Sequence, residues 1–162
     1  MKLWYCFLLV LLVAACGQQD HQAQLQTEID SLQQKLDDSY KPGFGEFMSG
    51  IQMHHAKLWF AGTNNNWPLA EFEMQEIREA LDDIRKYNTD RPETSNLGLI
   101  DPAMDSLDHA IQAHNPSLFK NSFQLLTNSC NECHRETNHA FNVITLPLSP
   151  PVSNQRFDLP QQ

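Results

Sequence analysis

Apolar residues recur every three or four positions along most of the chain, and this spacing predicts helices because such residues share one helix face. Four stripes run over about residues 45–61, 68–87, 101–114 and 116–139. No segment alternates apolar and polar residues over a useful length, so the pattern does not predict a strand. The pattern therefore predicts an all-α fold, an antiparallel four-helix bundle over residues 42–141.

The stripes also predict which side chains form the core of this bundle. Pro42, Pro68, Pro102 and Pro116 each stand at or just before the start of a stripe, where a missing backbone N–H costs nothing. The expected core residues are Phe47, Ile51, His55, Leu58, Trp59, Ala70, Met74, Ile77, Leu81, Ile84, Met104, Leu107, Ile111, Phe119, Phe123, Leu126, Cys130, Cys133 and Thr137.

Two segments lie outside this helical pattern. Residues 88–100 read as a polar loop. Residues 142–162 are rich in proline and read as an irregular tail. A few apolar side chains can still hold this tail against the bundle, namely Val143, Ile144, Leu146 and Phe157.

The start of the chain has the organisation of an export signal. Lys2 precedes an apolar run that ends at Ala15 and is too short to span a bilayer. The run ends in Val-Ala-Ala-Cys, which resembles the bacterial lipoprotein signal, where a cysteine after two small residues is acylated and becomes the new N-terminus. This resemblance implies a signal peptide over residues 1–15, a lipid anchor on Cys16 and a periplasmic location, with Gly17 favouring the outer membrane over the inner one. The alternative is an ordinary cleaved signal with a chance cysteine.

A polar, Gln-rich segment follows over residues 16–41. Leu25, Ile29, Leu32 and Leu36 form a narrow helical stripe within it. We expect a partly helical, lipid-anchored tether that holds the bundle off the membrane. A short coiled coil and a helix packed on the bundle are the alternatives, since fewer than three heptads are weak evidence for a coiled coil.

Composition and charge narrow the function further. The chain has 162 residues, 20 acidic and 11 basic side chains and a net charge of −9, which excludes a simple basic nucleic-acid binder. Four cysteines are too few for a dense disulfide scaffold. Their positions in the chain are therefore more informative about function than their number.

The last two cysteines form the sequence Cys-Asn-Glu-Cys-His over residues 130–134, which is the c-type haem attachment motif. On a helix Cys130, Cys133 and His134 share one face, so two thiols can bond the vinyl groups of haem while the imidazole meets the iron. There are three alternatives to haem attachment. The motif could be a redox disulfide, although the usual βαβ context is absent, or a structural zinc site, which would need two further ligands. The third is a chance match.

A domain of this size, with four expected helices and this motif on the last one, resembles the class II c-type cytochromes, the cytochrome c′ and cytochrome c-556 bundles. The resemblance implies one haem c, thioether bonds to Cys130 and Cys133, and His134 as the proximal iron ligand. It also implies electron transfer with a redox partner protein and a homodimer. A five-coordinate binder of small gases such as NO and CO, and a structural lipoprotein, are the alternatives. We expect no enzymatic activity, because the sequence offers no nucleophile–base arrangement.

In class II cytochromes the first bundle helix faces the far side of the haem. At about 100° per residue, His55 lies nearest the centre of the apolar stripe, Met48 is next, and Met53 points away. We therefore expect His55 as the distal ligand and Met48 as the second candidate, with a vacant or water-bound iron as the alternative. His139 is expected at a solvated helix end, with a contact to the haem edge as the alternative.

Overall fold

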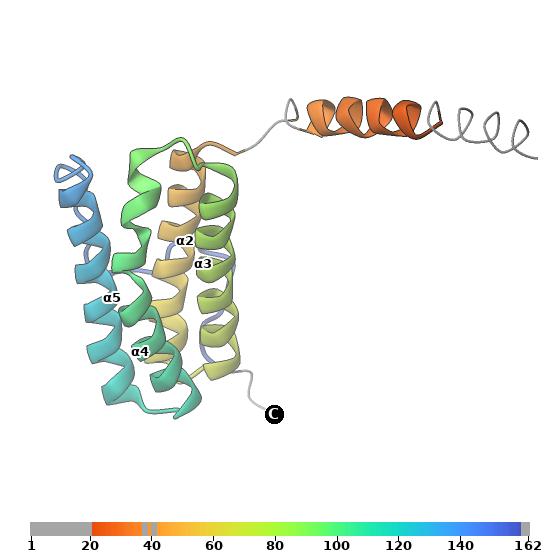
Figure 1. Cartoon of the computed structure of the whole chain (residues 1–162). Coiled ribbons are helices and arrows are strands. Elements are labelled where there is room, and N and C mark those ends of the chain that lie inside the picture. Colours follow the sequence, from red (N-terminus) through yellow and green to blue (C-terminus); the bar gives the residue numbers. More distant parts are fainter. Residues whose placement is uncertain (1–20, 37–38, 40–41, 160–162) are drawn as a thin grey trace, which may run out of the picture. The chain divides into compact units, whose positions relative to one another are not determined.

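The structure is a computed structural model that describes residues 21–36, 39 and 42–159. Every regular element in this part of the chain is helical, so the all-α prediction is confirmed for it. The chain divides into two units, Met1–Lys41 and Pro42–Gln162, and each is described by itself. The elements of the second unit are α2 (Phe44–Thr63), α3 (Trp67–Tyr87), the 3₁₀ helix η1 (Pro92–Leu99), α4 (Asp101–Gln112) and α5 (Pro116–Glu136) (Figure 1).

Proline and asparagine mark where the helices of this unit begin. Pro68, Pro102 and Pro116 lie in the first two positions of α3, α4 and α5, as predicted. The side-chain carbonyls of Asn66 and Asn115 accept hydrogen bonds of 3.0 to 3.3 Å from backbone N–H groups in the first turns of α3 and α5. These caps satisfy donors that have no partner inside the helix, so the short connections are sharply defined.

The prediction of a polar loop over residues 88–100 is wrong. Eight of these residues form η1, and Leu97, Ile100 and Glu93 are buried. A 3₁₀ helix has about 3.0 residues per turn and is short, so its buried positions do not produce the stripe that reveals an α-helix. This segment supplies one wall of the cavity described below.

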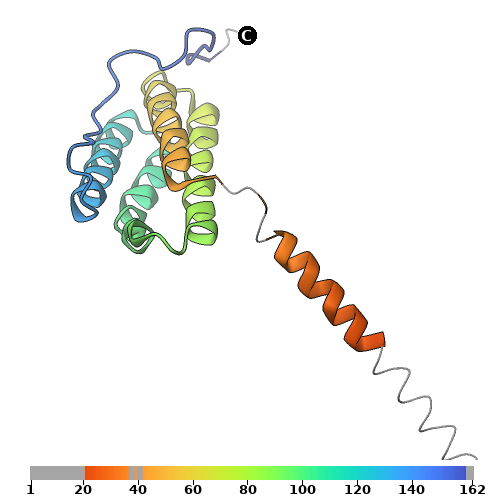
Figure 2. The ribbon, with the colours of Figure 1, turned by 90° about the horizontal axis from the view of Figure 1, so that it is seen from above.

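Helix α2 packs against α3 and α5, and α4 packs against α5 (Figure 2). The predicted apolar stripes face the space between these helices. Each of the four helices contributes large side chains that are fully buried there. These side chains are Leu58, Met74, Ile77, Leu81, Ile84, Met104, Leu107, Phe119, Phe123 and Leu126. The core is therefore continuous from α2 to α5.

The tail after α5 is irregular, as predicted, but several of its residues are held against the bundle. The ring of Phe157 is 6% exposed and lies 5.7 Å from the ring of Phe60, and Leu146 packs against the core. Val143 is 65% exposed, so the expectation that it holds the tail is wrong.

In the first unit, residues 21–36 are helical. The four apolar side chains of its stripe are 45–61% exposed. No helix in the described part of the chain is long and apolar enough to cross a membrane. The expected signal peptide over residues 1–15 and the expected lipid anchor on Cys16 lie outside the described residues.

Gly62 tests the packing of the core. A Cβ atom at this position of α2 would lie 2.1 Å from the ring of Phe119, which is fully buried. We expect Gly62→Ala to lower the free energy of unfolding by about 1–3 kcal/mol, because the ring has no space to move into. Gly50→Ala is the matched control on the same helix, since a Cβ there would meet nothing within 4 Å apart from the backbone of its own helix. It should raise the free energy of unfolding by about 0.5–1 kcal/mol in the same urea titration.

Candidate functional site

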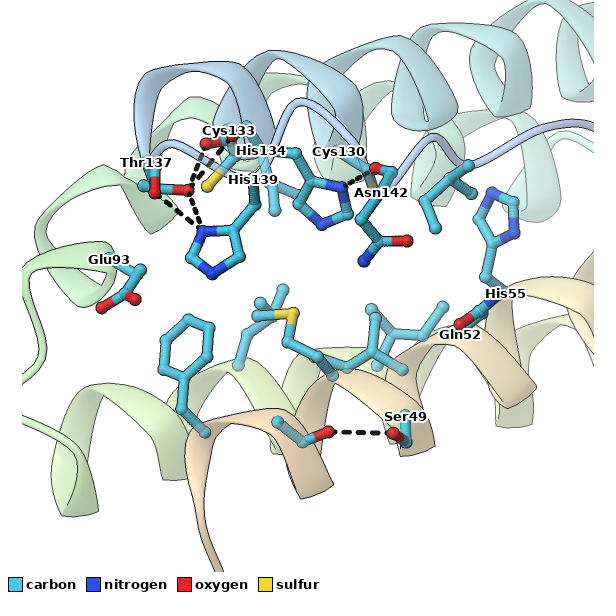
Figure 3. Close-up of a pocket in the computed structure, with 18 of the residues that line it drawn as sticks. Ser49, Gln52, His55, Glu93, Cys130, Cys133, His134, Thr137, His139 and Asn142 are labelled. Carbon is cyan, nitrogen blue, oxygen red and sulfur yellow. Dashed lines mark hydrogen bonds between the residues drawn. The ribbon is translucent and has the colours of Figure 1, made fainter.

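A cavity of about 270 Å³ lies between the first half of α2 and the last turns of α5 (Figure 3). Residues from α3, η1 and the segment after α5 complete its wall. It brings together every haem-site residue that the sequence predicts, namely Met48, His55, Cys130, Cys133 and His134. The other lining residues are Phe44, Gly45, Ser49, Ile51, Gln52, Ile77, Leu81, Arg91, Glu93, Ile100, Leu126, Thr137, His139, Asn142 and Ile144.

Cys130 and Cys133 are free thiols one turn apart on α5. Burial, with a smaller contribution from Cys133, raises the pKa of Cys130 to about 12. Burial and the charge of Glu93 raise the pKa of Cys133 above its ordinary value. Both groups are therefore protonated at neutral pH. Dithiol redox motifs depend on a lowered thiol pKa, so this environment does not favour the redox-disulfide alternative.

The imidazole of His134 is oriented by the chain that follows α5. Its Nδ1 donates a hydrogen bond of 2.6 Å to the carbonyl of Asn142 (Figure 3). A carbonyl can only accept, so the proton is on Nδ1 and the lone pair is on Nε2. Histidines that bind metals commonly have this arrangement, because the second hydrogen bond fixes the tautomer and the ring orientation.

These residues fit a covalently bound haem. Two thiols and an imidazole oriented through its Nδ1 hydrogen bond line the same cavity from one helix, and much of the remaining wall is apolar. Such a wall keeps water from a bound porphyrin and contributes to its reduction potential. No group of three or more His, Cys, Asp or Glu side chains suited to a directly bound metal ion occurs among the described residues.

His55 is already engaged in the core. It is 4% exposed, and its Nε2 lies 2.9 Å from Oγ1 of Thr127. That hydroxyl donates its only hydrogen to the carbonyl of Phe123 at 3.0 Å, so it accepts the Nε2–H of His55. Binding iron through Nε2 would require this hydrogen bond to break. The half-buried Met48 lines the same cavity, and a thioether binds iron without losing a proton.

The sequence did not identify Glu93 and Arg91 as wall residues, and it favoured a place outside the wall for His139. Glu93 is 7% exposed and pairs with Arg91 at 2.9 Å, and within the described residues its Oε2 has no hydrogen-bond partner. The half-buried His139 lines the cavity and donates from Nδ1 to the carbonyl of Thr137 at 2.7 Å, which favours the alternative of a place beside the haem site. These residues come from η1 and from the segment after α5, where no periodic pattern signals burial.

The comparisons with known proteins identify no relative. No protein-family model matches the chain, and no curated protein or solved structure matches it. The functional conclusion therefore depends on the cavity and on the residues that line it.

Burial of His55 predicts a pH dependence of stability. Burial lowers the pKa of His55 from 6.5 to about 4, so the folded chain keeps this imidazole neutral. The stability that this neutral imidazole allows is fully present above pH 6.5. It is lost as the pH falls towards 4, because in this range the unfolded chain takes up a proton on His55 and the folded chain does not. For the haem-free chain we expect a loss of about 3 kcal/mol in the free energy of unfolding across this window. Urea titrations at several pH values measure it, and His55→Leu should lack this part of the slope.

Proposed function

We propose that the protein is a membrane-anchored c-type cytochrome that holds one covalent haem in this cavity and transfers single electrons. A single observation carries the proposal: both thiols of the C-x-x-C-H motif line one apolar cavity with His134, whose Nε2 lone pair is available. When bound, haem supplies an iron that changes charge by one electron, and the protein sets its potential through ligands, burial and hydrogen bonds.

In this proposal Cys130 and Cys133 form the thioether bonds and His134 is the proximal ligand. Met48 replaces His55 as the preferred distal ligand, because His55 would have to give up its hydrogen bond to Thr127. The helices α2, α3, α4 and α5 form an antiparallel four-helix bundle around the haem. The contacts of α2 with α3 and α5, and of α4 with α5, support this arrangement.

The envelope location is part of the same proposal and comes from the sequence. Acylation of Cys16 would anchor the chain on the periplasmic side, more readily at the outer membrane than at the inner one, with residues 16–41 as the tether. A redox partner protein exchanges electrons with the haem, and nucleic acid is not a partner, given the net charge of −9. A homodimer is proposed by analogy with class II cytochromes.

Absorption spectra of the purified chain test this function. We expect a haem spectrum that persists after extraction with acidified acetone, since thioether bonds keep the haem on the chain. The reduced form should bind CO slowly, because the distal position is occupied. A chain that releases all its haem on extraction, or never carries any, would contradict the proposal.

One observation favours a second function. If the thioether of Met48 does not reach the iron, the distal side stays open, since the hydrogen bond to Thr127 holds His55. The chain would then be a five-coordinate binder of small gases such as NO and CO. Rapid CO binding by the reduced wild-type protein would support this alternative over the electron carrier.

A further inference from the structure

The chain reverses direction after α5 and returns along the last turns of that helix. Asn138 has φ 63°, a left-handed conformation that asparagine tolerates, and it follows Thr137, the C-cap of α5. Residues 142–144 then run beside α5 as a short extended segment, named here the strap (Figure 3). Asn142 and Ile144 line the cavity, whereas Val143 between them is 65% exposed. The strap is therefore part of the wall of the site.

Two hydrogen bonds from one side chain hold the strap. Nδ2 of Asn131 donates to the carbonyl of Ile144 at 2.8 Å, and the N–H of Ile144 donates to Oδ1 of Asn131 at 2.8 Å. Only an amide side chain offers a donor and an acceptor in this geometry, so it pairs with the backbone as a neighbouring strand would. Asn131 occupies the first variable position of the haem attachment motif.

The strap in turn holds the imidazole of His134. The carbonyl that accepts a hydrogen bond from Nδ1 of His134 at 2.6 Å belongs to Asn142. Asn142 lies two residues before Ile144, which Asn131 holds. We propose that Asn131 is a positioning residue whose amide fixes the strap, so that the carbonyl of Asn142 sets the tautomer and ring orientation of His134. This inference rests on the proposed function, because it makes His134 the iron ligand.

Two consequences distinguish this role from simple packing of the tail. A hydrogen bond from Nδ1 raises the basicity of a ligating imidazole, which favours the oxidised iron. Loss of the bond should therefore raise the midpoint potential. The second consequence does not depend on haem: the amide hydrogen of Ile144 should exchange slowly with solvent only while Asn131 accepts it.

The test compares Asn131→Ala with Glu132→Ala in the full chain. Glu132 is the other variable residue of the motif, is exposed and pairs with Arg135, so its loss leaves the strap intact. In Asn131→Ala we expect exchange at the Ile144 amide to accelerate at least about tenfold, and the midpoint potential to rise by up to about 59 mV, a tenfold change in a one-electron equilibrium. Glu132→Ala should leave both values at the wild-type level. Asn131→Asp, which keeps the acceptor and loses the donor, should lie between wild type and Asn131→Ala in exchange.

Unchanged exchange and unchanged potential in Asn131→Ala would overturn the inference, and so would equal shifts in Glu132→Ala. Faster exchange with an unchanged potential would also overturn it, because the strap would then not act on the ligand. A wild-type chain that carries no haem would contradict the proposed function instead. In that case exchange at Ile144 in the haem-free variants still decides whether Asn131 holds the strap.

Discussion

Replacing both Cys130 and Cys133 with alanine is expected to remove all covalently held haem from the chain. Each thiol lines the cavity beside His134, and no other cysteine occurs among the described residues of the folded unit. The haem stain of the protein band on a denaturing gel measures this directly. Addition of the S–H bond of each cysteine across a vinyl group would form the thioether with no leaving group, so each missing thiol removes one possible bond.

Single substitutions refine this expectation. Cys130→Ala and Cys133→Ala should each retain one thioether bond and a reduced amount of haem. Glu132→Ala is the control within the motif, because Glu132 is exposed, pairs with Arg135 and is not one of the residues that line the cavity. Full covalent haem in the double variant, or loss of haem in the control, would contradict the assignment of these two cysteines.

Replacing Met48 with alanine is expected to open the distal side of the iron. The thioether of Met48 lines the cavity and is not held by a hydrogen bond of the kind that fixes His55 to Thr127. Its loss should convert a six-coordinate, low-spin haem into a five-coordinate, high-spin one. Minor states of proteins are commonly populated to about 1–10%, and if the variant makes such an open form the only one, apparent CO affinity should rise about 10- to 100-fold.

The matched variant for this experiment is His55→Leu. It removes a side chain from the same wall and leaves Met48 in place, so the spin state should stay low. Electron paramagnetic resonance of the oxidised proteins reports the spin state. A spin change in His55→Leu and none in Met48→Ala would reverse the order of the two distal candidates and restore the sequence-based expectation.

Periodic segments were predictable from the sequence, and the reason is visible in the core. Ile77, Leu81 and Ile84 recur at helical spacing on α3, and all three are buried as expected. The motif placed Cys130 and His134 on one helix face for the same reason. Residue spacing is therefore sufficient to predict which side chains share a face wherever the chain forms a regular α-helix.

Contacts made by non-periodic segments could not be predicted in this way. Glu93 belongs to a 3₁₀ helix, and Asn142 belongs to an extended segment that returns along α5. Their places in the wall depend on chain reversals, such as the left-handed turn at Asn138, that no stripe reveals. The order of the distal candidates changed for a related reason. Helical spacing located His55 on the core face, but the hydrogen bond to Thr127 comes from a residue 72 positions away in the chain.

The most direct measurement is the denaturing mass of the peptide that contains Cys130 and Cys133, from chain exported by a bacterium that matures c-type cytochromes. We predict that this peptide carries the added mass of one haem, bound through both cysteines. The same peptide with two unmodified thiols, or with a disulfide in place of haem, would contradict the proposed function.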